Sequence, residues 1–440
     1  MKNSTAANRT GETAPASGSL FASLLRRGSI WLLAVALIYA FELFRDFSAL
    51  STQIDFSHYY ASALAMREGI DPYTTDLTPI AASLGLDLAE MKLATYPPTF
   101  VLCFEPLTLL PPVPAHWVWA GMNVVFLAIA LYLLLDGLPA DTDLRLALAG
   151  LAILYAPVTD NFFYAQTQIL ILLLLVLFMR WMKSGRYALA GSALALAVLL
   201  KVFPAVLVCY LVLRRKERAI AYTGLGVVLG GVVTLVLVGV ARSLHFLQVL
   251  PFLISSDFLG RPENVALAAM VTHLFRAVSQ AARLELARRV AVLIADLGLL
   301  ALTAHATLKS SKLSDGGDEH VIALWVVATV LLSPTAWMHY LVLFLLPFAV
   351  FVRLHLRGEA PPVAAGLELA SYSIVELLMV VYLALGALAG WMRQVPAWAP
   401  VPSMVGWNIS LLLAYAGAYL LAVQTMPARV AAASAAPIRR

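Results

Sequence analysis

Four side chains that could take part in proton transfer lie close together in the sequence: Asp55, His58, Tyr59 and Tyr60. They follow the first long apolar segment, where we expect a boundary between membrane and water. A carboxylate at such a boundary can accept a proton from a sugar or lipid hydroxyl, so Asp55 is a candidate catalytic base. The alternative is that Asp55 is the N-cap of a helix beginning near Ser57. The residues favour both interpretations equally, and the two are compatible.

His339 is the second catalytic candidate, at a proline break between two apolar segments, within Ser333–Tyr340. An imidazole there can donate to a phosphate or orient a substrate hydroxyl. The alternative is an interfacial belt of Trp, Tyr and His, which includes Trp337 and is common in membrane proteins. Composition alone favours the belt.

Lys201 has apolar residues on both sides, in Leu199–Pro204. A lysine at such a position is costly unless it is paired or its ammonium group reaches the interface. Pairing with a lipid phosphate would explain it, and snorkelling to the interface is the rival explanation.

Three amides lie between two apolar segments, at Asn161, Gln166 and Gln168. Amides both donate and accept hydrogen bonds, which suits the recognition of sugar hydroxyls. The alternative is an ordinary turn between two helices. The full set of candidate substrate-binding residues is His58, Tyr59, Tyr96, Asn161, Gln166, Gln168, Lys201, Arg261, Asn264 and Trp337.

Three acids lie within apolar stretches, at Glu105, Asp296 and Glu376. Acids inside a membrane often relay protons, so the rival function is a proton-coupled transporter or a flippase of a lipid-linked sugar precursor that uses Asp296 and Glu376. Against it, the sequence lacks the repeat-related spacing and paired discontinuous helices of inverted-repeat transporters. A non-catalytic membrane scaffold is a third possibility.

The composition predicts the elements that must position these residues. Of 440 residues, 61% are hydrophobic and only 12% are charged, which excludes a soluble globular domain. Apolar runs of about 20 residues recur along the chain, so we expect an all-α polytopic membrane protein with about twelve crossings. Cys103 and Cys209 lie in apolar runs and indicate neither a disulfide framework nor a metal site.

We expect a disordered cytoplasmic tail over 1–27, an integral-membrane domain over 28–424 and a cytoplasmic tail over 425–440. The outer loops are expected at 45–114 and 242–289. Within the first loop, the sequence predicts helices at His58–Arg67 and Leu86–Leu93 and a re-entrant segment at Tyr96–Pro112. The predicted spans are near 28–44, 115–135, 144–158, 168–182, 186–200, 203–213, 219–241, 290–308, 320–333, 340–352, 366–389 and 405–423.

Basic residues predict the orientation. Lysine and arginine are enriched in cytoplasmic loops, so the net charge of +5 reflects that face rather than nucleic-acid binding. The Asp55 loop is then extracytoplasmic. The clusters that we expect on the cytoplasmic side are Arg180/Lys183/Arg186, Arg214/Arg215/Lys216/Arg218, Lys309/Lys312 and Arg353/Arg357.

Several of these segments, taken in order, resemble glycosyltransferase family 87. The family belongs to the C-type superfamily of integral-membrane glycosyltransferases, and its best-known members are mycobacterial polyprenol-phosphate-mannose-dependent mannosyltransferases that elongate phosphatidylinositol mannosides. The segments that carry the resemblance are Asp55–Tyr60, Gly69–Tyr73, Tyr96–Pro98 with Pro106-Leu107 and Leu110-Pro111, Lys201–Pro204 and Ser333–Tyr340.

The resemblance implies an extracytoplasmic, inverting transfer of a hexose, with mannose expected, from a polyprenyl-phosphate donor to a lipid or glycan acceptor in the cell membrane. It implies no metal and no other cofactor. By position, Asp55 matches the proposed catalytic aspartate of the family, and His339 matches its active-site histidine. Lys201 matches a motif lysine whose role we infer from charge. The family commonly has Gly-Gln-x-Asn where this chain has Ala165-Gln166-Thr167-Gln168, so acceptor specificity is not carried over.

Overall fold

The computed structural model describes residues 17–47, 54–88, 91–138, 141–261, 263–278, 284–310, 317–364, 366–377 and 400–424. Within these ranges all regular secondary structure is helical, which confirms the predicted all-α class.

Four described segments are long and apolar enough to cross a membrane: α5 (Pro112–Leu135), α11 (Glu217–Val238), α16 (Glu285–Lys309) and the continuous segment Met338–Leu356. The last combines η6 (Met338–Phe344) and α18 (Leu345–Leu356). A fifth span results if α6 (Thr142–Leu154) and α7 (Ala156–Phe163), which meet at 48°, are one broken span. The chain is therefore a multi-pass membrane protein, while the total of about twelve crossings stays a prediction.

Shorter apolar helices complete the bundle, and two of them form its centre. Every residue of α17 (Glu319–Leu331) is buried, as are most residues of α8 (Gln168–Lys183). A helix that is apolar on all sides is stable only when other helices surround it. The remaining helices of the bundle are α1 (Ser17–Phe47), α9 (Tyr187–Leu200), η3 (Phe203–Val206), α10 (Leu207–Leu213), α15 (Leu267–Val278) and α20 (Pro400–Gln424).

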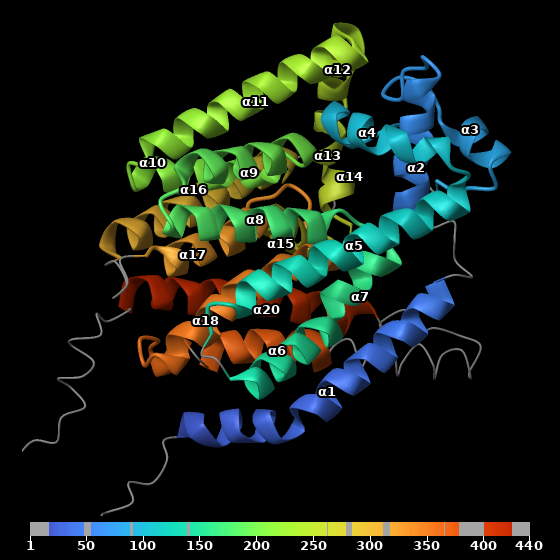
Figure 1. The fold of residues 1–440 in the computed structure, drawn as a ribbon. Helices are drawn as coiled ribbons and strands as arrows, with labels where there is room; N and C mark the ends of the chain where they lie inside the picture. Colours follow the sequence, from blue (N-terminus) through green and yellow to red (C-terminus); the bar gives the residue numbers. More distant parts are fainter. Residues whose placement is uncertain are drawn as a thin grey trace, which may run out of the picture.

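Short helices gather at one end of the long ones (Figure 1). From the first predicted loop come α2 (Ile54–Arg67), α3 (Thr78–Ser83), α4 (Pro98–Phe104) and η2 (Glu105–Leu109), and from the second come α12 (Val240–His245), η4 (Phe246–Gln248), α13 (Leu250–Leu253) and α14 (Ser256–Leu259). The candidate site lies at this same end. The helix α8 begins there with the predicted site residue Gln168, and α9 ends there with Leu200, directly before Lys201.

Two predictions for the first loop are wrong: the position of its second helix and the start of its first. No helix covers the described residues of Leu86–Leu93; α3 lies earlier, where Pro79 suits the first turn and Gly85, with φ +69°, follows the helix end. In addition, α2 begins at Ile54 rather than near Ser57. Its end at Arg67 agrees with the prediction, and Gly69 follows with φ +82°.

The first helix begins earlier than expected, because α1 starts at Ser17, inside the segment predicted as a disordered tail. Residues 1–16 and the predicted C-terminal tail over 425–440 lie outside the described residues. The segment at Tyr96–Pro112 forms α4 and η2, and its re-entry into the membrane stays a prediction.

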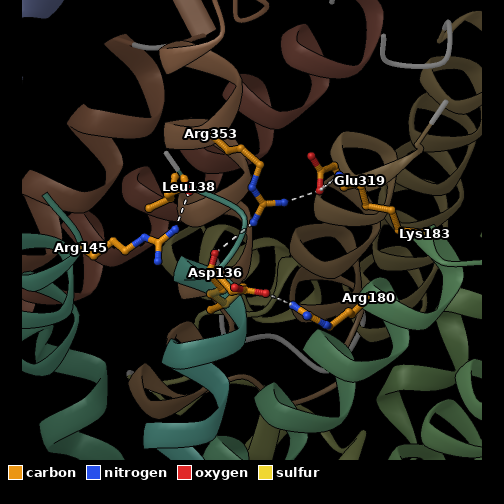
Figure 2. A network of polar contacts seen from close by, with 8 residues as sticks. Asp136, Leu138, Arg145, Arg180, Lys183, Glu319 and Arg353 are labelled. Carbon is orange, nitrogen blue, oxygen red and sulfur yellow. Dashed lines mark hydrogen bonds and ion pairs between the residues drawn. The ribbon is translucent and has the colours of Figure 1, made fainter. Parts of the chain in front are cut away.

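The opposite end of the bundle holds a network of charged side chains, of which Arg353 and Glu319 are buried (Figure 2). The guanidinium of Arg353 donates to Glu319 and, over 3.0 Å, to the carbonyl of Leu134 near the end of α5. Lys183 lies 3.5 Å from the same Glu319 carboxylate. Gly137 makes room for this arrangement, because a Cβ there would lie 2.7 Å from Arg353 Cζ. Members of two predicted cytoplasmic clusters therefore meet at the end of the bundle away from Asp55.

Candidate active site

The first turn of α2 carries Asp55, which is half-buried. Because α2 begins at Ile54, Asp55 lies inside the helix rather than at its N-cap, which contradicts the capping interpretation. The N-terminal end of a helix nevertheless favours a negative charge. The Tyr96 hydroxyl donates to Asp55 Oδ1 over 3.4 Å. Burial raises the pKa of Tyr96 well above its usual value and the charge of Asp55 adds to this, so the phenol stays a donor.

Gln166 joins two predicted site residues. Its Oε1 accepts a hydrogen bond from the Tyr59 hydroxyl at 3.1 Å and another from Lys201 Nζ at 3.3 Å. Tyr59 also packs edge-on against Tyr96, with ring centroids 4.6 Å apart. Residues far apart in the sequence therefore meet in one aromatic-walled cluster, which we call the Asp55 cluster: Asp55, Tyr59, Tyr96, Gln166, Lys201 and Tyr340.

Lys201 lies where α9 ends, and its side chain points into the Asp55 cluster. The residue is 7% exposed, and Nζ lies 4.7 Å from the ring centre of Tyr340 and 5.7 Å from that of Tyr96. Within the described part of the chain, Lys201 forms no ion pair with a carboxylate. Burial lowers the pKa of Lys201 to about 7, while the charge of Asp55 favours the protonated form. In that form, an ammonium group held by one amide and two aromatic rings is suited to receive an anion.

His339 is positioned by an acid that the sequence analysis did not select. Its Nδ1 lies 3.2 Å from Asp160 Oδ2, and both side chains are largely buried. Asp160 belongs to α7 and directly precedes the amide-rich segment. The amides and aromatics of that segment predict binding of sugar hydroxyls, and they give no signal for the neighbouring carboxylate. His339 is the second residue of η6, which the extended residue Trp337 precedes.

The amide-rich segment forms a tight turn between α7 and α8. The Asn161 side chain donates to the carbonyl of Gln166 over 3.2 Å, and Trp119 Nε1 donates to the carbonyl of Ala165 over 2.7 Å. Ala165 has φ +51°, a conformation that favours glycine. The Asn161 amide thus supports the turn, Gln166 points into the Asp55 cluster, and Gln168 begins α8 fully buried.

Residues of the second predicted outer loop, 242–289, pack against the segment that carries His339. Asn264 is fully buried, donates to the carbonyl of Pro334 and accepts from the backbone N–H of Ala336 over 3.0 Å. Trp337 packs edge-on against Phe258, whose other contacts include the guanidinium of Arg261. Asn264 therefore holds the loop before His339, and among the described residues none of its hydrogen bonds joins it to the Asp55 cluster.

His58 makes no hydrogen bond with the Asp55 cluster among the described residues, although the charge of Asp55 acts on its ring. It is fully buried, and its Nε2 makes a hydrogen bond with the carbonyl of Met91. Burial lowers the pKa of His58, so the ring is neutral near pH 7. His58 therefore anchors the loop after α3 to α2.

The three intramembrane acids do not assemble into a pathway. Glu376 accepts a hydrogen bond from the backbone N–H of Ala156 over 2.9 Å and so caps the first residue of α7. Asp296 lies midway along α16, and Glu105 begins η2. Among the residues that the structure describes, no hydrogen bond joins any two of the three, and no group of three His, Cys, Asp or Glu side chains could hold a metal ion.

The arrangement of a carboxylate and a buried ammonium around an aromatic wall agrees with the resemblance, and comparison with known sequences decides the family. The glycosyltransferase family 87 profile matches residues 94–334, more than half of the chain. The chain belongs to glycosyltransferase family 87. The match begins just before Tyr96 and includes Gln166 and Lys201, whereas Asp55 and His339 lie outside it.

Two proteins from Mycobacterium tuberculosis are similar to about half of this chain. An alpha-(1->3)-arabinofuranosyltransferase is 26% identical over 55% of this chain and 54% of its own length. A polyprenol-phosphate-mannose-dependent alpha-(1-2)-phosphatidylinositol mannoside mannosyltransferase is 30% identical over 43% of this chain and 46% of its own length. The chain thus spans about half the length of these relatives.

One solved structure is also similar: ArnT from Cupriavidus metallidurans bound to undecaprenyl phosphate. It covers 93% of this chain and 78% of its own, at 14% identity and a TM-score of 0.34. A likeness at this score carries no conclusion about the site.

Proposed function

We propose that the protein is a membrane glycosyltransferase that moves a hexose, with mannose as the first candidate, from a polyprenyl-phosphate donor to a hydroxyl of a lipid or glycan acceptor. One observation carries the proposal. A carboxylate and a buried ammonium group share one aromatic-walled cluster, since Tyr96 donates to Asp55 and its ring faces Lys201. Family membership supports the reaction type, and the mannosyltransferase relative supports the donor class.

The proposed reaction is a single displacement. The acceptor oxygen forms a bond to the anomeric carbon as the bond from that carbon to the phosphate oxygen breaks, which inverts the configuration. Because the pKa of a sugar hydroxyl lies far above neutral, Asp55 takes the hydroxyl proton during the attack. The leaving polyprenyl phosphate keeps the bonding electron pair and gains one negative charge. Lys201 and His339 are proposed to stabilise this charge where little water is present.

Burial supports the assignment of Lys201 to the donor phosphate. Removing an ammonium group from water is costly, and the amide and the two rings in contact with it are neutral, so an incoming phosphate would add to the charge of Asp55 in offsetting that cost. The isoprenoid tail would remain in the lipid between helices while the head group reaches the Asp55 cluster. We propose that this end of the bundle is extracytoplasmic in the cell membrane, since charged residues of the basic clusters lie at the other end.

Transfer of labelled sugar tests the proposal. The purified protein, the Asp55→Asn variant and a control, Asp76→Asn, are incubated with synthetic polyprenyl-phosphate mannose and membrane lipid. Asp76 is exposed and lies in the first outer loop, where it pairs with Lys92, so its variant should transfer normally. We expect transfer by the wild type and the control, and a loss of at least about 100-fold in Asp55→Asn. Equal transfer by all three would contradict the role of Asp55.

The sugar is a separate question within the same experiment. Because one relative is an arabinofuranosyltransferase, a polyprenyl-phosphate arabinofuranose is tested beside the mannose donor. Transfer from the pentose donor alone would keep the reaction type and overturn the hexose assignment. Failure of every polyprenyl-phosphate donor in the presence of native membrane lipid would contradict the proposed function.

A further inference from the structure

Asp160 and His339 form a pair whose geometry limits what the histidine can do. His339 Nδ1 lies 3.2 Å from Asp160 Oδ2, with the side chains 4% and 16% exposed. A carboxylate accepts hydrogen bonds, so the proton of this contact belongs to Nδ1. The other ring nitrogen, Nε2, is buried and has no hydrogen-bond partner among the described residues.

The pair is fixed in place on both sides. Asp160 lies in α7, whose first N–H is held by Glu376, and the next residue, Asn161, closes the turn that presents Gln166. His339 is followed by Tyr340, whose ring lies 4.7 Å from Lys201 Nζ. The free nitrogen of His339 therefore belongs to a segment that borders the Asp55 cluster.

We infer that Asp160 is a positioning residue that binds His339 through Nδ1 and thereby reserves Nε2 for the substrate. The inference rests on the proposed function, in which His339 faces the substrate. With the proton on Nδ1, Nε2 of the neutral ring accepts a hydrogen bond from a substrate hydroxyl, and Nε2 donates to the donor phosphate only when the ring is doubly protonated. A carboxylate that holds one imidazole nitrogen fixes both the tautomer and the orientation of the ring, as in catalytic triads. Asp160 would not touch the substrate, so its whole effect on transfer would pass through His339.

A double-mutant cycle tests that dependence. Sugar transfer is measured for the wild type, Asp160→Ala, His339→Ala and the double variant, with Asp136→Asn as a control carboxylate from the other end of the bundle. We expect Asp160→Ala to lower kcat/KM by about 10- to 100-fold in the wild type and to have no further effect in His339→Ala. The control should behave as the wild type. A loss of the same size in both backgrounds would mean that Asp160 supports the fold alone and would overturn the inference.

The protonation of the ring gives a readout that does not depend on transfer. Protein with ¹⁵N-labelled histidine is prepared in lipid bilayers, and His339→Gln identifies the His339 signals by their loss. In the wild type we expect a protonated Nδ1, and in both Asp160→Ala and the milder Asp160→Asn a change in the Nδ1 signal at the same pH. An unprotonated Nδ1 in the wild type would overturn the inference even if transfer is observed. If transfer fails but Nδ1 is protonated and responds to Asp160, the pairing holds and the proposed function is what fails.

Discussion

Tyr96 connects Asp55 to Lys201: its hydroxyl donates to Asp55 Oδ1 over 3.4 Å, and its ring centre lies 5.7 Å from Lys201 Nζ. One side chain therefore contacts the proposed base through its polar end and the proposed phosphate-binding group through its π face. A second connection runs from Lys201 through Gln166 to Tyr59. The base and the cation are thus held by the same framework, and the two ends of Tyr96 can be tested separately.

Removing each end of Tyr96 should give different kinetic effects. Tyr96→Phe keeps the ring and deletes the donor to Asp55, and a hydrogen bond to a charged group contributes about 1.5–3 kcal/mol. We therefore expect kcat to fall by about tenfold or more with little change in the donor KM. Tyr96→Leu also removes the ring over Lys201, so the donor KM should rise as well. Initial rates at varied donor concentration separate the effects, and equal KM values for the two variants would contradict the role of the ring.

Lys201 should determine donor binding rather than acceptor binding. Lys201→Ala removes the ammonium group expected to receive the donor phosphate, and we expect the donor KM to rise by about tenfold or more while the acceptor KM stays close to that of the wild type. Lys201→Met is the matched variant, because it keeps an unbranched apolar stem and removes only the charge. Steady-state kinetics with each substrate varied in turn gives both constants. A normal donor KM with normal turnover in Lys201→Met would remove the residue from the site.

The sequence could predict which residue types carry the chemistry, but not how they are paired. Lys201 was found because a lysine between apolar residues needs an explanation, and Asp55 because it follows an apolar segment. Asp160 could not be recognised in the same way, since its importance comes from a contact with His339, which is 179 positions away in the sequence. The mutual dependence of Gln166, Tyr59 and Lys201 is likewise a result of helix packing.

The fold shows the same division. Long apolar runs predict helices well, because the length and the hydropathy of a run can both be read from the contiguous sequence. The secondary structure of the polar loop after α2 is harder to predict. Leu86–Leu93 has helix-forming residues, but the helix of this loop in the structure is α3, at Thr78–Ser83. There the loop is held by tertiary contacts, such as that of His58 with the Met91 carbonyl, which no local pattern reveals. The role of Asn264 as a clamp on the Pro334 loop also depends on such a contact.

The charge network at the other end of the bundle should affect stability without affecting the reaction. In Gly137→Ala the new methyl group would lie 2.7 Å from Arg353 Cζ. Arg353 can move only by disturbing its contacts with Glu319 and Leu134, so we expect a loss of about 1–3 kcal/mol in stability. Gly121→Ala is the matched control, because Gly121 lies in α5 with open space around it. Thermal unfolding in detergent should give a lower Tm for Gly137→Ala alone, while the folded fraction of both variants should transfer sugar at the rate of the wild type. Equal Tm values would show that Arg353 adapts freely, and a slower rate in folded Gly137→Ala would show that this end of the bundle acts on the distant site.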